Sequence, residues 1–310
     1  MDCGKGGVGK TLIATSLAAF LAHEGERTAL LDTDGGHNVM RTLGFEKQLP
    51  INSLCEVAHN LDVAVVEPAK YVNIADWKAT DKPLDGYFAQ FPADSGGIAI
   101  LDMALKFFGI IVDITTVQKF MSIVALLHEA EKRRLANVII DVEPTAGLKL
   151  LLNNAEASMR SLRNMRSTGK IALAVLNVKW GDIAAFLTGE YIAKVDFYCH
   201  RIERALEWLR HASYIIVCKP ELAPVLQGIE VSRIIESFGG RIHGCVVNEI
   251  RGEVHERGAL ESLPKKWAVI QVKRIPELHI PGGDLWPVLR NVGRLVSPLV
   301  AVHINEPERD

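Results

Sequence analysis

Apolar and polar residues follow two different patterns along this chain. Continuous apolar runs predict buried strands, and they lie at residues 28–32, 61–67, 138–141, 213–218, 242–247 and 267–272. Residues 11–23 and 222–238 instead repeat apolar positions every three or four residues, which is the period of an amphipathic helix. Buried strands that alternate with helices indicate a parallel sheet covered on both faces, so the predicted fold is α/β.

Two longer stretches, residues 70–134 and 147–211, look helical without following this alternation. In the second, apolar side chains recur at helical spacing from Tyr191 to Leu209, with charged side chains mostly opposite. Two interpretations stay open: these helices cover the sheet, or they form a helical subdomain that binds a client or partner. We expect one domain over residues 1–310, with both stretches as candidate helical subdomain segments.

The segment that precedes the first helix carries the strongest chemical signal. Gly4, Gly9, Lys10 and Thr11 satisfy the phosphate-loop pattern G-x-x-x-x-G-K-[ST]. Glycines let the backbone curl so that its N–H groups point at a polyphosphate, and the following helix adds the positive end of its dipole. Lys10 supplies charge to the β- and γ-phosphates, and the Thr11 hydroxyl is placed for Mg²⁺. The predicted nucleotide contacts are Gly4, Lys5, Gly6, Gly7, Val8, Gly9, Lys10 and Thr11.

The start of the chain is unusual for this motif, because only Met1, Asp2 and Cys3 precede Gly4. A phosphate loop ordinarily follows a buried central strand of about six residues. Either the start is truncated or the sheet has lost that strand, which would leave hydrogen-bonding edges on both neighbours. We expect a truncated or misplaced start.

Composition narrows the class of protein. The formal net charge of −2 gives no sign of a general nucleic-acid or anionic-membrane surface. The five cysteines are odd in number and lack C-x-x-C spacing, which indicates a reducing compartment and mostly buried thiols. There is no signal peptide and no run of 18 apolar residues, so we expect a cytoplasmic protein without an integral membrane segment.

The form of the loop, with Lys5 directly after the first glycine, resembles the deviant phosphate loop of one group of ATPases. This group, of the SIMIBI type, includes partition and septum-site proteins, the nitrogenase iron protein, and the arsenite-pump and tail-anchored-protein-targeting ATPases. The resemblance implies that Lys5 reaches a phosphate, commonly across a nucleotide-sandwich dimer. It therefore implies a homodimer that binds ATP and Mg²⁺.

The loop after the strand at residues 28–32 resembles switch I of the arsenite-pump and targeting branch. Residues 34–38 read D-G-G-H-N, where that branch has D-P-A-H-N. The resemblance implies that Asp34 is the catalytic carboxylate that positions the attacking water, with Asp32 secondary. The glycine pair in place of Pro-Ala implies a looser loop.

The strand at residues 138–141 ends in Asp141, at the position that would hold Mg²⁺ beside Thr11. Residues 141–151 resemble the D-T-A-P-T-G-H-T-L-R-L of switch II in the same branch. Asp141, Pro144 and Thr145 match in register, whereas Val142, Glu143, Ala146 and Gly147 differ.

Three later segments continue the resemblance in the same order. Residues 215–221 are similar to V-V-x-x-P-E, and residues 245–248 are similar to a segment with V-V-N. The resemblance implies that Asn248 reads the adenine through its amide donor and acceptor. It also implies that Pro276 lies in a loop that packs near the base.

Differences within that branch limit the function further. No cysteine trio for a trivalent metalloid and no zinc-binding C-x-x-C is visible. Apolar residues 98–108 and 120–127 are candidates for a client groove. The leading hypothesis is an ATP-hydrolysing, nucleotide-switched dimer with a protein client or membrane-protein partner. The alternatives are a partition- or septum-site-type ATPase, which the acidic tail disfavours, and a nucleotide-binding scaffold with little turnover.

Overall fold

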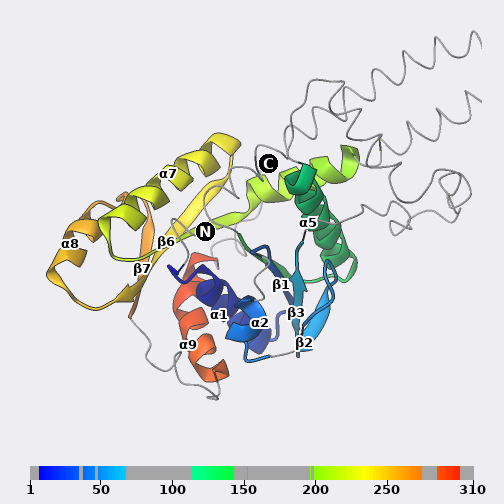
Figure 1. The fold of residues 1–310 in the computed structure, drawn as a ribbon, viewed down its shortest axis with the longest axis horizontal. Helices are drawn as coiled ribbons and strands as arrows, with labels where there is room; N and C mark the ends of the chain where they lie inside the picture. Colours follow the sequence, from blue (N-terminus) through cyan, green and yellow to red (C-terminus); the bar gives the residue numbers. More distant parts are fainter. Residues whose placement is uncertain are drawn as a thin grey trace, which may run out of the picture. The chain divides into compact units, whose positions relative to one another are not determined.

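The computed structural model describes residues 7–34, 38–45, 48–67, 114–142, 152, 196, 199–273 and 285–300. The helices are α1 (Lys10–His23), α2 (Asn38–Thr42), α5 (Ile114–Lys132), α7 (Leu222–Phe238), α8 (Val254–Glu261) and α9 (Trp286–Val296), with a 3-10 turn, η3 (Ser297–Leu299) (Figure 1). The strands are β1 (Thr28–Asp32), β2 (Cys55–Ala58), β3 (Leu61–Val65), β4 (Asn137–Asp141), β5 (Ser213–Cys218), β6 (Arg241–Ile250) and β7 (Ala268–Lys273). Within these ranges no helix is long and apolar enough to cross a membrane.

The chain divides into two compact units. One consists of Met1–Glu67, Ala125–Leu152 and Ala205–Asp310, and we call it the sheet unit because it holds every described strand. The other consists of Pro68–Val124 and Asn153–Arg204, and most of it lies outside the described residues. The helical subdomain over residues 70–134 and 147–211 therefore stays a prediction.

The strands of the sheet unit form two hydrogen-bonded sheets, β2-β3-β1-β4 and β5-β6-β7. All of their pairs are parallel except β2 with β3. Every residue of β1 is buried, as expected for a strand with neighbours on both sides and helices above it. The predicted α/β fold with a parallel sheet is confirmed, although within the described residues β4 and β5 do not pair with each other.

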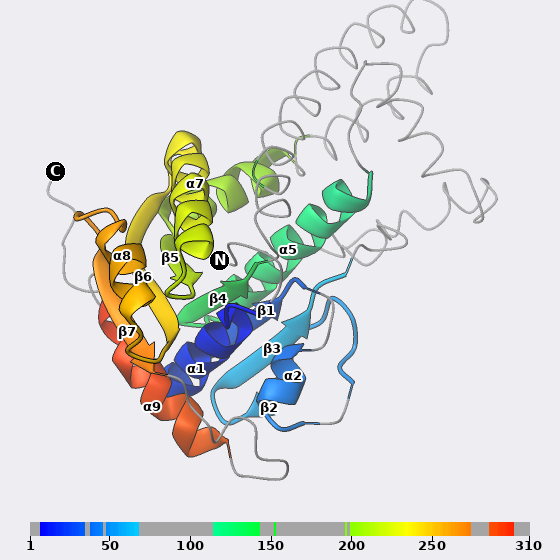
Figure 2. The same ribbon diagram turned by 60° about the vertical axis from the view of Figure 1, so that its left-hand side comes forward.

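Helix α1 connects the two sheets through different sides of its surface. Ala18 and Ala22 pack in a core cluster with Leu30 of β1 and Leu61 of β3. Ile13 instead belongs to a second cluster, with Val8, Val217, Val246 and Val272. A helix that is apolar around most of its circumference is typical of a buried position. This position places the N-terminus of α1, and the phosphate loop before it, at the carboxyl ends of the strands (Figure 2).

Helix α9 runs beside α1 and brings the C-terminal part of the chain to the phosphate-loop helix (Figures 1 and 2). The two helices approach most closely at Gly293. A Cβ atom there would lie 2.5 Å from Cβ of Phe20 and would overlap the carbonyl oxygen of Ser16. Helix α7 packs on β5 and β6, and Gly239 ends it in the left-handed conformation, with φ 93°.

Candidate nucleotide-binding site

The described part of the phosphate loop consists of Gly7, Val8 and Gly9, and it leads directly into α1. Gly7 has φ 112° and Gly9 has φ 92°, which residues with a side chain rarely adopt. The N-cap residue of α1 is Gly9, which has no side chain to cap the helix, and the first turn holds no acidic residue. The amide groups of that turn can therefore serve an anion. Gly4, Lys5 and Gly6 lie outside the described residues.

Two buried carboxylates lie next to each other at the carboxyl ends of β1 and β4. Asp32 ends β1 and Asp141 ends β4, and the parallel register places them opposite each other. The Asp32 side chain is fully buried, and Asp141 is 3% exposed. Burial raises the pKa of Asp141, and the Asp32 charge raises it further, because two anions are held close together in a medium of low polarity.

The phosphate-loop side chains offset part of this cost. The Thr11 hydroxyl donates a hydrogen bond to the Asp141 carboxylate, and the positive charge of Lys10 also acts on it, so both lower its pKa. Lys10 is itself only 8% exposed. One oxygen of Asp141, Oδ2, is buried without a hydrogen-bond partner. An unsatisfied carboxylate oxygen beside a hydroxyl is a hard oxygen donor set that fits Mg²⁺, which binds through one or two carboxylates and substrate phosphates.

The chain after β1 is tied to the same strand end. The Thr33 hydroxyl donates to the carbonyl oxygen of Asp141 over 2.7 Å, and the Thr33 N–H donates to it over 3.1 Å. The next N–H, that of Asp34, donates to Oδ1 of Asp32 over 3.1 Å. The Asp34 side chain is exposed at this end of the sheet, whereas residues 35–37 lie outside the described residues. The structure thus brings Asp34, Asp141, Lys10 and Thr11 to one edge.

Asn248 reaches the site from the other sheet. It lies near the carboxyl end of β6, is 3% exposed, and its Nδ2 donates to the carbonyl oxygen of Val8 over 3.0 Å. The structure thus brings Asn248 beside the phosphate loop through a contact that the sequence did not reveal, and its role in reading adenine stays a prediction. Pro276 lies outside the described residues.

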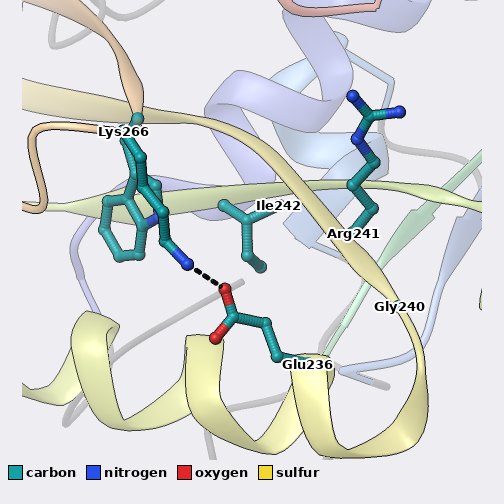
Figure 3. Close-up of a pocket in the computed structure, with 6 residues that line it drawn as sticks. Glu236, Gly240, Arg241, Ile242 and Lys266 are labelled. Carbon is teal, nitrogen blue, oxygen red and sulfur yellow. Dashed lines mark hydrogen bonds and ion pairs between the residues drawn. The ribbon is translucent and has the colours of Figure 1, made fainter.

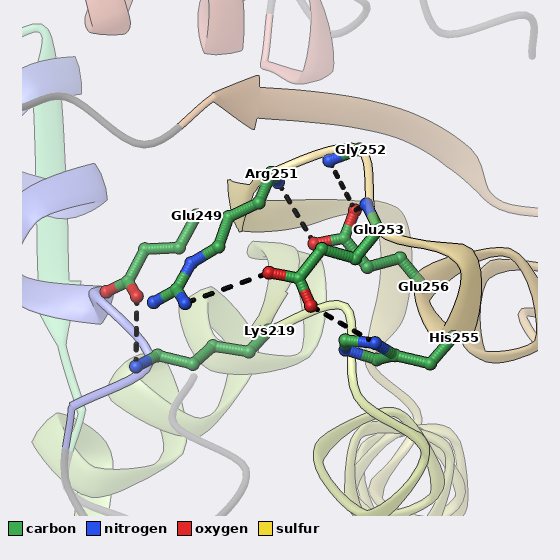
Figure 4. Close-up of polar contacts among 7 residues, drawn as sticks. All are labelled: Lys219, Glu249, Arg251, Gly252, Glu253, His255 and Glu256. Atoms are coloured by element: carbon green, nitrogen blue, oxygen red, sulfur yellow. Dashed lines mark hydrogen bonds and ion pairs between the residues drawn. The ribbon is translucent and has the colours of Figure 1, made fainter.

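The turn that follows Asn248 is held by charged groups (Figure 4). Lys219, after β5, pairs with Glu249 at 3.1 Å. The Glu256 carboxylate accepts hydrogen bonds from the backbone N–H groups of Arg251, Gly252 and Glu253. These hydrogen bonds lower the pKa of Glu256 because they favour its charged form. The bond from the Glu253 N–H, together with the reciprocal bond from the Glu256 N–H to the Glu253 side chain, forms a capping box at the start of α8.

Two thiols pack near the site on the opposite face of the sheet. The Sγ atoms of Cys218 and Cys245 are 3.6 Å apart, and both residues are fully buried. Their neighbours Val217 and Val246 pack with α1, so the alternation along a strand directs the two thiols to the other face. Among the described cysteines, Cys199, Cys218 and Cys245 are buried and Cys55 is half-buried, which agrees with the expectation of mostly buried thiols.

A surface pocket of about 230 Å³ lies at the amino end of β6, away from Asn248 (Figure 3). Lys266 and Glu236 pair across it at 2.6 Å. Its lining residues are Glu236, Gly240, Arg241, Ile242, Lys266 and Trp267. None of them belongs to the predicted nucleotide site.

Comparison with known proteins decides the family. Residues 1–279 match the family described as anion-transporting ATPase. The chain belongs to this family. It is 22% identical over 266 residues to the ATPase ASNA1 homolog 2 of Paramecium tetraurelia, which covers 80% of this chain and 74% of that protein. It is 23% identical to the ATPase get3 of Neurospora crassa, over 80% of this chain and 71% of that protein.

The chain is also similar to a protein of Chlorobaculum tepidum that is named as an arsenical pump-driving ATPase. It is 24% identical, over 89% of this chain and 66% of that protein. Among solved structures, the MinD cell division protein of Aquifex aeolicus matches with a TM-score of 0.50 at 15% identity, over 98% of this chain and 97% of that one. The structural match shows a fold similar to that of MinD, and the family match confirms the resemblance found in the sequence.

Proposed function

We propose that this anion-transporting ATPase family member is a Mg²⁺-dependent ATPase whose dimer switches with the bound nucleotide. The observation that carries the proposal is the cluster at the N-terminus of α1. There, Lys10 and Thr11 lie against the buried Asp141, and Asp32 is opposite Asp141 in the register. A buried carboxylate with an unsatisfied oxygen is costly unless a cation serves it.

Each group has a separate task in this proposal. Lys10 and the backbone N–H groups at the N-terminus of α1 bind the phosphates and offset their negative charge. Thr11 and Asp141 would hold Mg²⁺, which when bound neutralises charge on the transferred phosphoryl group. Asp34, exposed at the same edge, orients the attacking water. Lys5 reaches a phosphate across the dimer, as the resemblance implies.

The switch follows from how Asp34 is attached. Its backbone N–H donates to the Asp32 carboxylate, and the hydroxyl of the preceding Thr33 donates to the main-chain carbonyl oxygen of Asp141. A change in what Asp141 binds can therefore be transmitted to the segment that carries Asp34. The helical segments at 70–134 and 147–211 would carry this movement to a protein client or membrane-protein partner in the cytoplasm, without a role for nucleic acid.

The test is Mg²⁺-dependent release of phosphate from ATP by the wild type, Lys10→Ala and Asp34→Asn. Light scattering with and without ATP reports the dimer. Lys266→Ala is the matched control, because this lysine pairs with Glu236 at the opposite end of β6. We expect both site variants to lose hydrolysis, the control to keep it, and ATP to favour the dimer. ATP binding without phosphate release would support a nucleotide-binding scaffold instead, and a folded protein with neither activity nor dimer contradicts the proposal.

A further inference from the structure

Asn248 makes one of the longest-range contacts in the site. Its Nδ2 donates to the carbonyl oxygen of Val8 over 3.0 Å, across 240 residues of sequence. Both residues are at least 95% buried. This hydrogen bond joins the carboxyl end of β6 to the middle of the phosphate loop, away from solvent that could replace it.

The space beside Gly9 is filled by the same amide. A Cβ atom at Gly9 would overlap Nδ2 of Asn248 and would lie 3.2 Å from its Cγ. Gly9 also has φ 92°, so the loop conformation and the amide both require glycine here. The Asn248 side chain thus lies against the loop backbone on two consecutive residues.

An irregularity in strand β6 orients the Asn248 side chain. The pairing of β6 with β7 shifts register between Val247 and Ile250, and such irregularities turn a side chain in a new direction. The next residue, Glu249, has φ 62° and is held by Lys219. Asn248 therefore lies between Val247, which pairs with β5 and β7, and Glu249, which is bound by Lys219.

We propose that Asn248 is a positioning residue for the phosphate loop. It holds the Val8 carbonyl toward β6, so that the loop presents N–H groups rather than this carbonyl to the polyphosphate. This inference rests on the proposed nucleotide function and deepens it. A residue that only reads adenine affects nucleotides with that base, whereas a loop-positioning residue affects every polyphosphate ligand equally.

The experiment compares calorimetric affinities for ATP, GTP and inorganic tripolyphosphate, each with Mg²⁺, in wild type and Asn248→Ala. Tripolyphosphate has no base, so it reports the loop alone. We expect Asn248→Ala to weaken all three ligands by a common factor of about three to ten, the effect of one lost hydrogen bond. Val247→Ala is the matched control, because Val247 is fully buried next to Asn248 but alternates to the other face. It should lower thermal stability and leave all three affinities unchanged.

A second measurement tests the contact itself. Gly9→Ala should weaken tripolyphosphate binding by a larger factor in the wild type than in the Asn248→Ala background, where the overlapping amide has been removed. Weakening of ATP alone by Asn248→Ala, or equal loss with Val247→Ala, would overturn the inference. A wild-type protein that binds none of the three ligands would instead overturn the proposed function before any variant is compared.

Discussion

Gly293→Ala tests the packing that positions the phosphate-loop helix. Gly293 is buried in α9, and its backbone is not in the left-handed region, so alanine suits its local conformation. A Cβ atom would nevertheless lie 2.5 Å from Cβ of Phe20 and 2.8 Å from the carbonyl carbon of Ser16. Both neighbours belong to α1, and the Ser16 atoms are backbone, so no rotamer change can relieve the contact.

Two opposing effects decide the result. Alanine is favoured over glycine in a helix by about 1 kcal/mol. Overpacking at a tight site costs about 1–3 kcal/mol, and the backbone contact with Ser16 places Gly293 toward the upper part of that range. We therefore expect a net loss of about 1–2 kcal/mol of unfolding free energy. About 1 kcal/mol corresponds to a decrease in Tm of roughly 2–4 °C for a domain of this order of size.

The assay is thermal unfolding, with Gly258→Ala as the matched control. Gly258 lies in α8, and a Cβ atom there meets nothing within 4 Å. The control gains the same helix propensity without the contact, so its Tm should rise. If Gly293→Ala raises the Tm as much as Gly258→Ala does, the close approach of α1 and α9 is wrong.

Three further predictions concern the site and the turn beside it. Asp141→Asn should raise the Tm of the ligand-free protein at pH 7, because the raised pKa marks an unfavourable buried charge, and should abolish Mg²⁺-dependent ATP binding measured by calorimetry; a lower Tm refutes this. Glu256→Gln should make the free energy of unfolding depend less on pH in the acid range. The lowered folded-state pKa of Glu256 contributes stability that is present above the unfolded pKa of about 4.3 and is lost as the pH falls through the folded pKa. An unchanged acid-unfolding curve contradicts that role. Thr33→Val should cost about 0.5–1.5 kcal/mol in denaturant unfolding, because it removes the 2.7 Å hydrogen bond to Asp141; no change means that the Thr33 N–H alone holds this strand end.

Helix α9 and strand β2 are elements that the predicted pattern of strands and helices did not include. Helix α9 places Leu289, Val292 and Val296 on one face at helical spacing, and all three are buried. This spacing of three to four residues is present in the sequence itself. Strand β2 has no fully buried residue, so it lacked the apolar run that marked the other strands.

The sequence by itself determined the local chemistry. The glycine and lysine spacing at Gly9 and Lys10 specifies the phosphate loop, and short apolar runs specify the parallel strands, because backbone conformation and burial depend on neighbouring residues. The tertiary structure alone decided that Asp32 lies opposite Asp141 and that Asn248 bonds to Val8. Strand register and the packing of one sheet against a distant loop depend on contacts between residues far apart in the chain. No local pattern encodes those distances.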